Sequence, residues 1–231
     1  AWDFGEHGLD WRWQDSALYA LGVGLGFDPE DNDQLRFTWE EDMLALPTMA
    51  VVLASSHFWL RDPETGVDWK KVVHGEEGMV LHRPLPSQGS FVTRSRIDEI
   101  IDKGEGRGAL IYMTREVFDA TTDEPVATIT RTTFARGDGG FGGPSGPVRS
   151  VHKLPDRAPD HVCDLPTLPQ QALIYRLNGD GNPLHADPDV AREAGFERPI
   201  LHGLCTFGVS GHALLKTLCG YEPARLRRFD V

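Results

Sequence analysis

The spacing of apolar residues predicts helices in the first part of the chain. The segment DSALYALGVGLG has leucines at helical spacing, with Asp15 or Ser16 as the N-cap and glycines at its end. The segment ALPTMAVVLASSHFWL continues from Pro47 and is apolar almost all round, as is typical of a helix enclosed by other structure. We therefore expect an amphipathic helix followed by a long buried one.

From about Met79 the spacing of apolar residues changes to the two-residue period that is typical of strands. SFVTRSRIDEIID, GALIYMTREVFDA and PVATITRTTFARG are rich in β-branched residues, and the turn-like segments KGEGRG and TTDE separate them. Helices followed by such a run predict an α+β fold, in which an antiparallel meander packs one face on a buried helix.

A Gly/Pro-rich connector, RGDGGFGGPSGPVRSVHKLPDRAPDH, then interrupts the pattern. Beyond it we expect a helix in LPQQALIYRL, a short helix in DPDVAREAGFERP capped by Asp187 or Asp189, and an apolar helix in ILHGLCTFGVSGHALLKTL. This order repeats the first half weakly, without a second meander. The prediction is a repeat at 1–140, a connector at 141–160 and a second, incomplete repeat at 161–231.

Composition narrows the class of protein. The 231 residues are 40% hydrophobic and 25% charged, with a net charge of −12 that argues against nucleic acid or an anionic membrane as partner. Neither a membrane span nor a signal peptide is evident. The cysteines, Cys163, Cys205 and Cys219, form no C-x-x-C pair, which favours a reducing compartment over disulfides or a zinc knuckle. We expect a soluble intracellular protein.

The segment NGDGNPLHADPD concentrates polar groups and admits three interpretations. Its Asn, Asp, Gly and Pro residues are those of a solvated turn. An EF-hand spacing starts at Asn178, but Pro183 occupies the position that requires Gly, which argues against calcium. General acid–base chemistry is the third interpretation, because Asp180 and His185 can converge on one water beside Asn182.

The longer segment YRLNGDGNPLHADPDVAREAGFERPILHGLCTFG decides between them by resemblance. It is similar, almost position by position, to the signature of the R-specific 2-enoyl-CoA hydratases, also called hydratase 2 or MaoC-like dehydratases. ALYALGVG, ALPTMAVV, VHGEEGMVLHRPLP, DKGEGRGALI and FARGDGGFGG resemble the first half of double hot-dog members, which include the hydratase module of the peroxisomal multifunctional β-oxidation enzyme. The resemblance implies two hot-dog repeats, each a sheet wrapped around an apolar helix, with the catalytic motif in the second.

The resemblance also implies the site. Asp180 and His185 would be the catalytic pair, Asn182 would orient the water, and the backbone N–H of Gly203 would bind the thioester oxygen. Substrate contacts are expected from a further set of family positions: His74, Gly75, Lys103, Gly181, Pro183 and Leu184. The basic residues of the connector are further candidates for a phosphate contact: Arg149, His152, Lys153 and Arg157.

The implied reaction is the reversible hydration of trans-2-enoyl-CoA to (3R)-3-hydroxyacyl-CoA. It requires no metal and no cofactor, since CoA is part of the substrate. The family further implies a homodimer, located in the cytoplasm of a bacterium or the peroxisome of a eukaryote, and a first repeat that can open a tunnel for long or bulky acyl chains. Members continue into further strands, with an aromatic ligand contact expected just past Val231. A non-catalytic acyl-CoA-binding subunit and, on fold alone, an acyl-CoA thioesterase remain alternatives.

Overall fold

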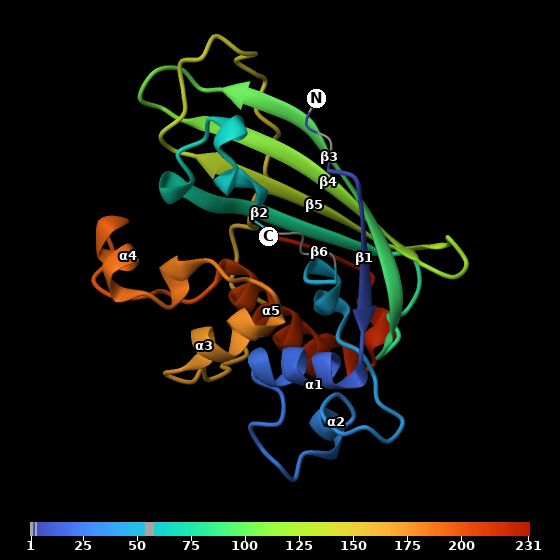
Figure 1. Ribbon diagram of the computed structural model, residues 1–231. Helices are drawn as coiled ribbons and strands as arrows, with labels where there is room; N and C mark the ends of the chain where they lie inside the picture. Colours follow the sequence, from blue (N-terminus) through green and yellow to red (C-terminus); the bar gives the residue numbers. More distant parts are fainter. Residues whose placement is uncertain (1, 3, 54–57) are drawn as a thin grey trace.

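An antiparallel six-stranded sheet forms the centre of the molecule, with the strand order β1-β3-β4-β5-β2-β6 (Figure 1). The computed structural model describes residues 2, 4–53 and 58–231. The strands are β1 (Glu6–Trp11), β2 (Val72–Leu81), β3 (Gly89–Asp102), β4 (Ala109–Asp119), β5 (Pro125–Ala135) and β6 (Arg228–Asp230). The predicted meander of β3, β4 and β5 is confirmed. The sequence pattern did not reveal β1 or most of β2, since polar residues and glycines interrupt their alternation.

The helices gather on one side of this sheet (Figure 1). They are α1 (Trp13–Gly22), α2 (Asn32–Leu35), α3 (Gln171–Tyr175), α4 (Pro188–Glu193) and α5 (Gly203–Leu214), which continues into a π-helical turn at Leu215–Cys219. The three helices predicted after the connector are therefore present as α3, α4 and α5. Asp187 is the N-cap of α4, where its side chain accepts hydrogen bonds from the backbone of Asp189 and Val190.

The hydrophobic core lies between the sheet and this helical layer. Alternate residues of a strand point to the same face, so Met79, Val117 and Ile129 meet the helices and are at most 2% exposed. Tyr19 of α1 and Phe207 of α5 close the core from the other side. Burial of these apolar side chains is the main force that holds α1 and α5 against the sheet.

Two glycines allow α5 to approach its neighbours closely. A Cβ at Gly208 would lie 2.5 Å from Cγ1 of Val23, and a Cβ at Gly211 would lie 2.3 Å from Cγ2 of Thr48. These glycines therefore serve the contacts of α5 with the end of α1 and with the segment that begins at Pro47, rather than contacts with the sheet.

The prediction of a long helix from Pro47 is wrong for those residues of the segment that the structure describes. Pro47–Val51 forms a short 3₁₀ helix followed by a turn, and residues 54–57 of the predicted helix lie outside the described residues. All five residues of the 3₁₀ helix are buried. An apolar run of this kind therefore indicates burial on every side, and a buried 3₁₀ segment is as consistent with it as a buried α-helix.

The start of α1 also differs from the prediction. Its N-cap is Arg12, and Asp15 stands at the third helical position, where its carboxylate accepts from the Arg12 backbone N–H at 2.9 Å in a capping box. Ser16 is buried; it accepts from Nε1 of Trp11 and donates to the Ser87 carbonyl. Asp15 therefore supports the helix end from inside the first turn.

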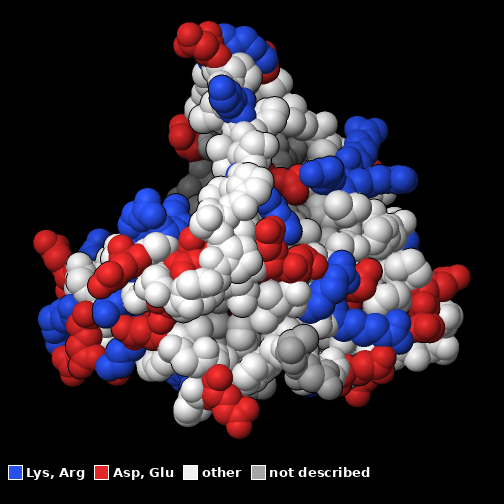
Figure 2. Space-filling view, turned by 90° about the horizontal axis from the view of Figure 1, so that it is seen from above, with Lys and Arg blue, Asp and Glu red and all other residues white. Residues whose placement is uncertain are grey.

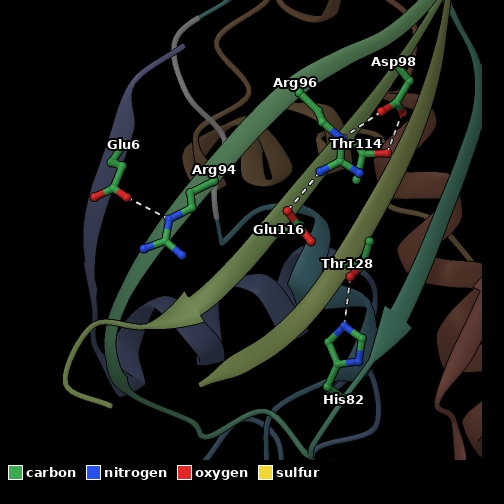
Figure 3. A network of polar contacts seen from close by, with 8 residues as sticks. All are labelled: Glu6, His82, Arg94, Arg96, Asp98, Thr114, Glu116 and Thr128. Carbon is green, nitrogen blue, oxygen red and sulfur yellow. Dashed lines mark hydrogen bonds and ion pairs between the residues drawn. The ribbon is translucent and has the colours of Figure 1, made fainter. Parts of the chain in front are cut away.

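The opposite face of the sheet is covered by cross-strand polar contacts (Figure 3). Arg94 pairs with Glu6 across β1 and β3, and Arg96 pairs with Glu116 across β3 and β4. At one point the connector covers this face, where the backbone N–H of Arg149 donates to Oη of the buried Tyr112. Polar side chains and part of the connector therefore cover this face of the sheet, and the helices cover the other.

Candidate active site

Two short turns position the polar groups between α3 and α4. Gly179 adopts φ +102° after the 3₁₀ turn Arg176–Asn178, a conformation that favours glycine. Pro183 opens a second 3₁₀ turn, Pro183–His185, and Oδ1 of Asn182 accepts from the Leu184 N–H at 3.2 Å to cap it. The turn-forming residues of this segment therefore bring Asp180 and His185 to one place.

A backbone carbonyl determines the tautomer of His185. Its Nδ1 lies 2.8 Å from the Ile200 carbonyl oxygen, which can only accept, so Nδ1 carries the proton. In the neutral ring Nε2 then holds the lone pair and can act as a base. A carboxylate oxygen of Asp180 lies within 4.8 Å of a ring nitrogen of His185. A carboxylate and an imidazole with one available nitrogen form an acid–base pair.

His202 supports this pair and was not predicted from the sequence. It is 1% exposed, and its ring stacks on that of His185 with centroids 3.7 Å apart. Its Nε2 lies 3.4 Å from the Asp180 carbonyl oxygen. Burial, together with the nearby His185, lowers the pKa of His202 to about 4, so the ring is neutral at pH 7. The histidine in PILHG, directly before a helix, was the signal that could have identified it.

The N-terminus of α5 faces the same region. His202 is the N-cap and Gly203 the first helical residue, so the Gly203 N–H has no acceptor within the helix. A Cβ added to Gly203 would meet only Cβ of His74, at 3.9 Å, which leaves room for a ligand to approach the backbone. The helix dipole adds a partial positive charge at this point. An oxyanion would be stabilised here.

A cavity of ≈ 550 Å³ joins these groups. Strands β4 and β5 form one wall, with Ile111, Met113 and Thr133 among its residues. Asp180, His185 and Gly203 line it from the helical side. The cavity therefore combines an apolar surface, which suits an acyl chain, with a few converging polar groups.

Two histidines and a carboxylate are also residue types that bind zinc. However, a metal ion must lie in the plane of each ligating ring, and the planes of His185 and His202 are stacked at only 28° to one another. Nδ1 of His185 is also engaged by the Ile200 carbonyl. Among the described residues, this arrangement favours acid–base chemistry over coordination of a metal.

The structure brings most of the predicted site residues to the cavity. Those that line it are His74, Asp180, Gly181, Asn182, Leu184, His185 and Gly203. Pro183 and Gly75 lie in the adjoining backbone, where Gly75 is at the bulge of β2 and Pro183 opens the capped turn. Lys103 is not among the lining residues, and its ammonium lies 5.3 Å from the Phe134 ring centroid.

The basic residues of the connector do not form a common site with the cavity. Arg149 lies over the Tyr112 ring at 4.1 Å, and Arg157 pairs with Asp160. His152 and Lys153 are exposed. On the face drawn in Figure 2, acidic and basic side chains alternate around a band of uncharged residues, without a continuous basic patch.

Comparison with known proteins gives the family. Residues 10–137 match the model of the MFE-2 hydratase 2 N-terminal domain, and residues 150–231 match the MaoC like domain. The chain belongs to the hydratase 2 family of MaoC-like proteins. The resemblance found in the sequence is therefore confirmed.

Individual relatives align with almost the whole chain. It is 42% identical to the 3-hydroxyacyl-thioester dehydratase Y of Mycobacterium tuberculosis, over 94% of this chain and 75% of that protein. The peroxisomal enoyl-CoA hydratase 2 of Arabidopsis thaliana is 37% identical, over 93% of this chain and 73% of that protein.

Solved structures support the same conclusion. A MaoC-like dehydratase from Phytophthora capsici superposes with a TM-score of 0.82 at 32% identity, covering 98% of this chain and 79% of that one. A double hot-dog protein of Mycobacterium tuberculosis matches at 15% identity with a TM-score of 0.55, over 94% of this chain and 73% of that one, a likeness of fold alone. The predicted α+β hot-dog class is confirmed.

Proposed function

We propose that this protein hydrates trans-2-enoyl thioesters of coenzyme A to (3R)-3-hydroxyacyl thioesters and catalyses the reverse dehydration. The observation that carries the proposal is the convergence of Asp180, His185 and the N-terminus of α5 at Gly203 on one cavity. Membership of the hydratase 2 family supports the same reaction.

The proposed chemistry uses the two groups of the acid–base pair, Nε2 of His185 and the carboxylate of Asp180. His185 Nε2 accepts a proton from a water held between His185 and Asp180, and the water oxygen adds to C3. The proton that the acid–base pair took from the water then passes to C2, so one water supplies both the hydroxyl and the hydrogen. Negative charge that develops on the thioester oxygen is stabilised by the Gly203 N–H and the dipole of α5. Asn182 uses Oδ1 for the cap, which leaves its amide N–H groups to orient the water.

The other predicted contacts fit a thioester bound along the cavity. We assign Gly181, Pro183 and Leu184 to the turn that borders the reacting carbons, and His74 with Gly75 to the strand edge opposite Gly203. Lys103, a cation on an exposed turn, is assigned to the CoA moiety outside the cavity. These roles extend the proposal beyond the acid–base pair.

The test follows loss of the enoyl absorbance with crotonyl-CoA and with longer enoyl-CoA substrates, and determines the configuration of the product. Asp180→Asn and His185→Gln each remove one acid–base partner, so we expect kcat to fall by about 10²–10⁴. Asp189→Asn is the matched control, because Asp189 pairs with Arg192 on the surface. Its activity should remain unchanged.

Other outcomes would identify the alternatives. Release of free CoA would indicate a thioesterase, and binding without turnover would indicate an acyl-CoA-binding subunit. A steep loss of activity beyond short chains would contradict the proposed tunnel for long or bulky acyl chains.

The assembly and compartment follow from the family and are part of the proposal. We expect a homodimer, which light scattering on the purified protein would test. A cytoplasmic location is expected in a bacterium and a peroxisomal one in a eukaryote, since a peroxisomal relative exists. No helix among the described residues is long and apolar enough to cross a membrane.

A further inference from the structure

Two arginines lie on the sheet wall of the cavity. Arg115 on β4 and Arg131 on β5 both line it, on the same face of the sheet as Met113 and Thr133. In the strand register Arg115 is opposite Ser95, and Arg131 stands between Met113 and Glu77. The sheet wall, which also carries Ile111 and Met113, therefore holds two cationic side chains.

Arg131 already has an anionic partner. Its Nε lies 2.9 Å from Oε2 of Glu77 and its Nη2 lies 3.0 Å from Oε1, a two-point pairing. Oε2 of Glu77 also accepts from Nε2 of His74 at 2.8 Å. Both oxygens of the buried Glu77 are thus used, and its charge is balanced by Arg131.

Arg115 has no such partner. It is 6% exposed, its Nε lies 3.4 Å from Oγ of Ser95, and its Nη1 has no hydrogen-bond partner among the described residues. Burial, and then the neighbouring Arg131, lower the pKa of Arg115 to about 10, so the group is still a cation at pH 7. A buried guanidinium without an anion is costly and is uncommon in proteins.

Among the residues that the structure describes, Arg115 is the buried cavity arginine without a hydrogen-bonded anion, although the charge of Glu77 acts to raise its pKa. Glu77 is committed to Arg131 and His74, and Asp180 lies on the helical side as part of the acid–base pair. Arg61, another cation that lines the cavity, lies over the Trp69 ring at 4.3 Å. An anion that entered along the sheet wall would therefore meet a cation with hydrogen-bond donors to spare.

We propose that Arg115, with Arg131 beside it, forms a subsite for a carboxylate at the distal end of the acyl chain. The planar fork of arginine matches a carboxylate in two-point geometry, and an alkyl chain cannot satisfy it. The substrate class is then enoyl-CoA derived from dicarboxylic acids. This inference rests on the hydratase function proposed above, because it assumes that the thioester lies at Gly203 and that the acyl chain crosses the cavity.

Saturated thioesters test the subsite without turnover, because they lack the reacting double bond. Hexanoyl-CoA against adipoyl-CoA, and octanoyl-CoA against suberoyl-CoA, differ by a terminal carboxylate at equal chain length. Isothermal titration should show about 10- to 100-fold tighter binding of the carboxylate member at one of these lengths. Equal affinities at both lengths would overturn the proposal.

The variant Arg115→Met removes the cation while it retains much of the side-chain volume. Replacing an unpaired buried charge in this way should leave stability unchanged or raise it, so the variant is expected to fold. It should bind the two members of each pair equally. Arg96→Met, the same substitution at an arginine that pairs with Glu116 on the opposite face of the sheet, is the matched control and should retain the preference.

The result separates the subsite from the hydratase function. If Arg115→Met keeps the carboxylate preference, the preference comes from another group and the subsite is overturned. An ω-hydroxyhexanoyl-CoA that binds as tightly as adipoyl-CoA would also overturn it, since charge would not be recognised. If the unchanged protein prefers adipoyl-CoA but fails to hydrate trans-2-hexenoyl-CoA, the hydratase function fails while the subsite stands.

Discussion

At the residue scale, the site depends on how each histidine is held. The Ile200 carbonyl orients His185, and the stacked, neutral His202 supports the ring without placing a positive charge beside it. His212 on α5 is a further buried histidine, 2% exposed, whose Nε2 lies 3.1 Å from Oη of Tyr221. Burial lowers its pKa to about 4 as well. Both rings therefore fold in the neutral form.

This burial predicts a specific acid sensitivity. The pKa of His202 and of His212 is about 4 in the folded protein against an ordinary value of 6.5, so the unfolded chain binds more protons between these values. Stability is complete above pH 6.5 and falls as the pH falls towards 4, by up to about 3 kcal/mol for each ring. Urea unfolding at pH 7.5, 6, 5 and 4.5 measures this loss in the free energy of unfolding.

A variant distinguishes these histidines from the carboxylates. Glu77, whose pKa lies below its ordinary value of 4.5 despite burial because Arg131 and His74 contact it, loses its contribution only at lower pH. His212→Gln, distant from Asp180 and His185 in the chain, should reduce the dependence of stability on pH between 6.5 and 4. An unchanged slope in this variant would contradict the assignment.

At the element scale, α5 has two tasks that depend on different glycines. Gly203 opens its N-terminus to the cavity, whereas Gly208 and Gly211 let its middle pack on α1 and on the 3₁₀ helix at Pro47–Val51. The sequence pattern predicted this helix correctly because its apolar residues are many and its ends are marked. This pattern alone could not tell which glycine faces a ligand and which faces a neighbouring element; the expectation for Gly203 came from the family resemblance.

Gly211→Ala tests the close packing. The new Cβ would lie 2.3 Å from Cγ2 of the buried Thr48, and the overlap should cost about 1–3 kcal/mol, partly offset by the roughly 1 kcal/mol advantage of Ala in a helix. Chemical denaturation should show a net loss of stability. Adding Thr48→Ser removes the clashing atom and should recover part of it.

Thr206→Ala is the control on the same helix, because Thr206 is exposed. Its stability should change by less than about 0.5 kcal/mol. If Gly211→Ala is as stable as this control, the helix has room to shift and the close contact does not constrain it.

At the scale of the whole molecule, the two halves of the chain interlock. Nε2 of Gln171 donates to the Gly22 carbonyl at 2.5 Å, and the rings of Tyr19 and Tyr175 lie 6.1 Å apart. Strand β6, near the end of the chain, pairs with β2, which belongs to the first half. The domain division at 141–160 stays a prediction, and these contacts indicate that the segments on either side fold together.

Two sets of intrinsic probes can test that cooperation. All six tryptophans lie in the first 70 residues, while the three cysteines lie after residue 160. Cys205 and Cys219 are at most 7% exposed, so thiol reagents reach them only on unfolding, whereas Cys163 reacts earlier. Tryptophan fluorescence and labelling of the buried thiols should give one common midpoint in urea. Two separate midpoints would show that the halves unfold independently.

The sequence by itself determined the parts that depend on local order: the meander of β3 to β5 from its alternation, α5 from its apolar run, and the family from the motif around Asp180 and His185. Only the tertiary structure decided which groups surround that motif. His202 joins the pair through stacking, and Arg115 and Arg131 reach the cavity through strand register. Such contacts join residues distant along the chain, and no local pattern of apolar and polar residues encodes them.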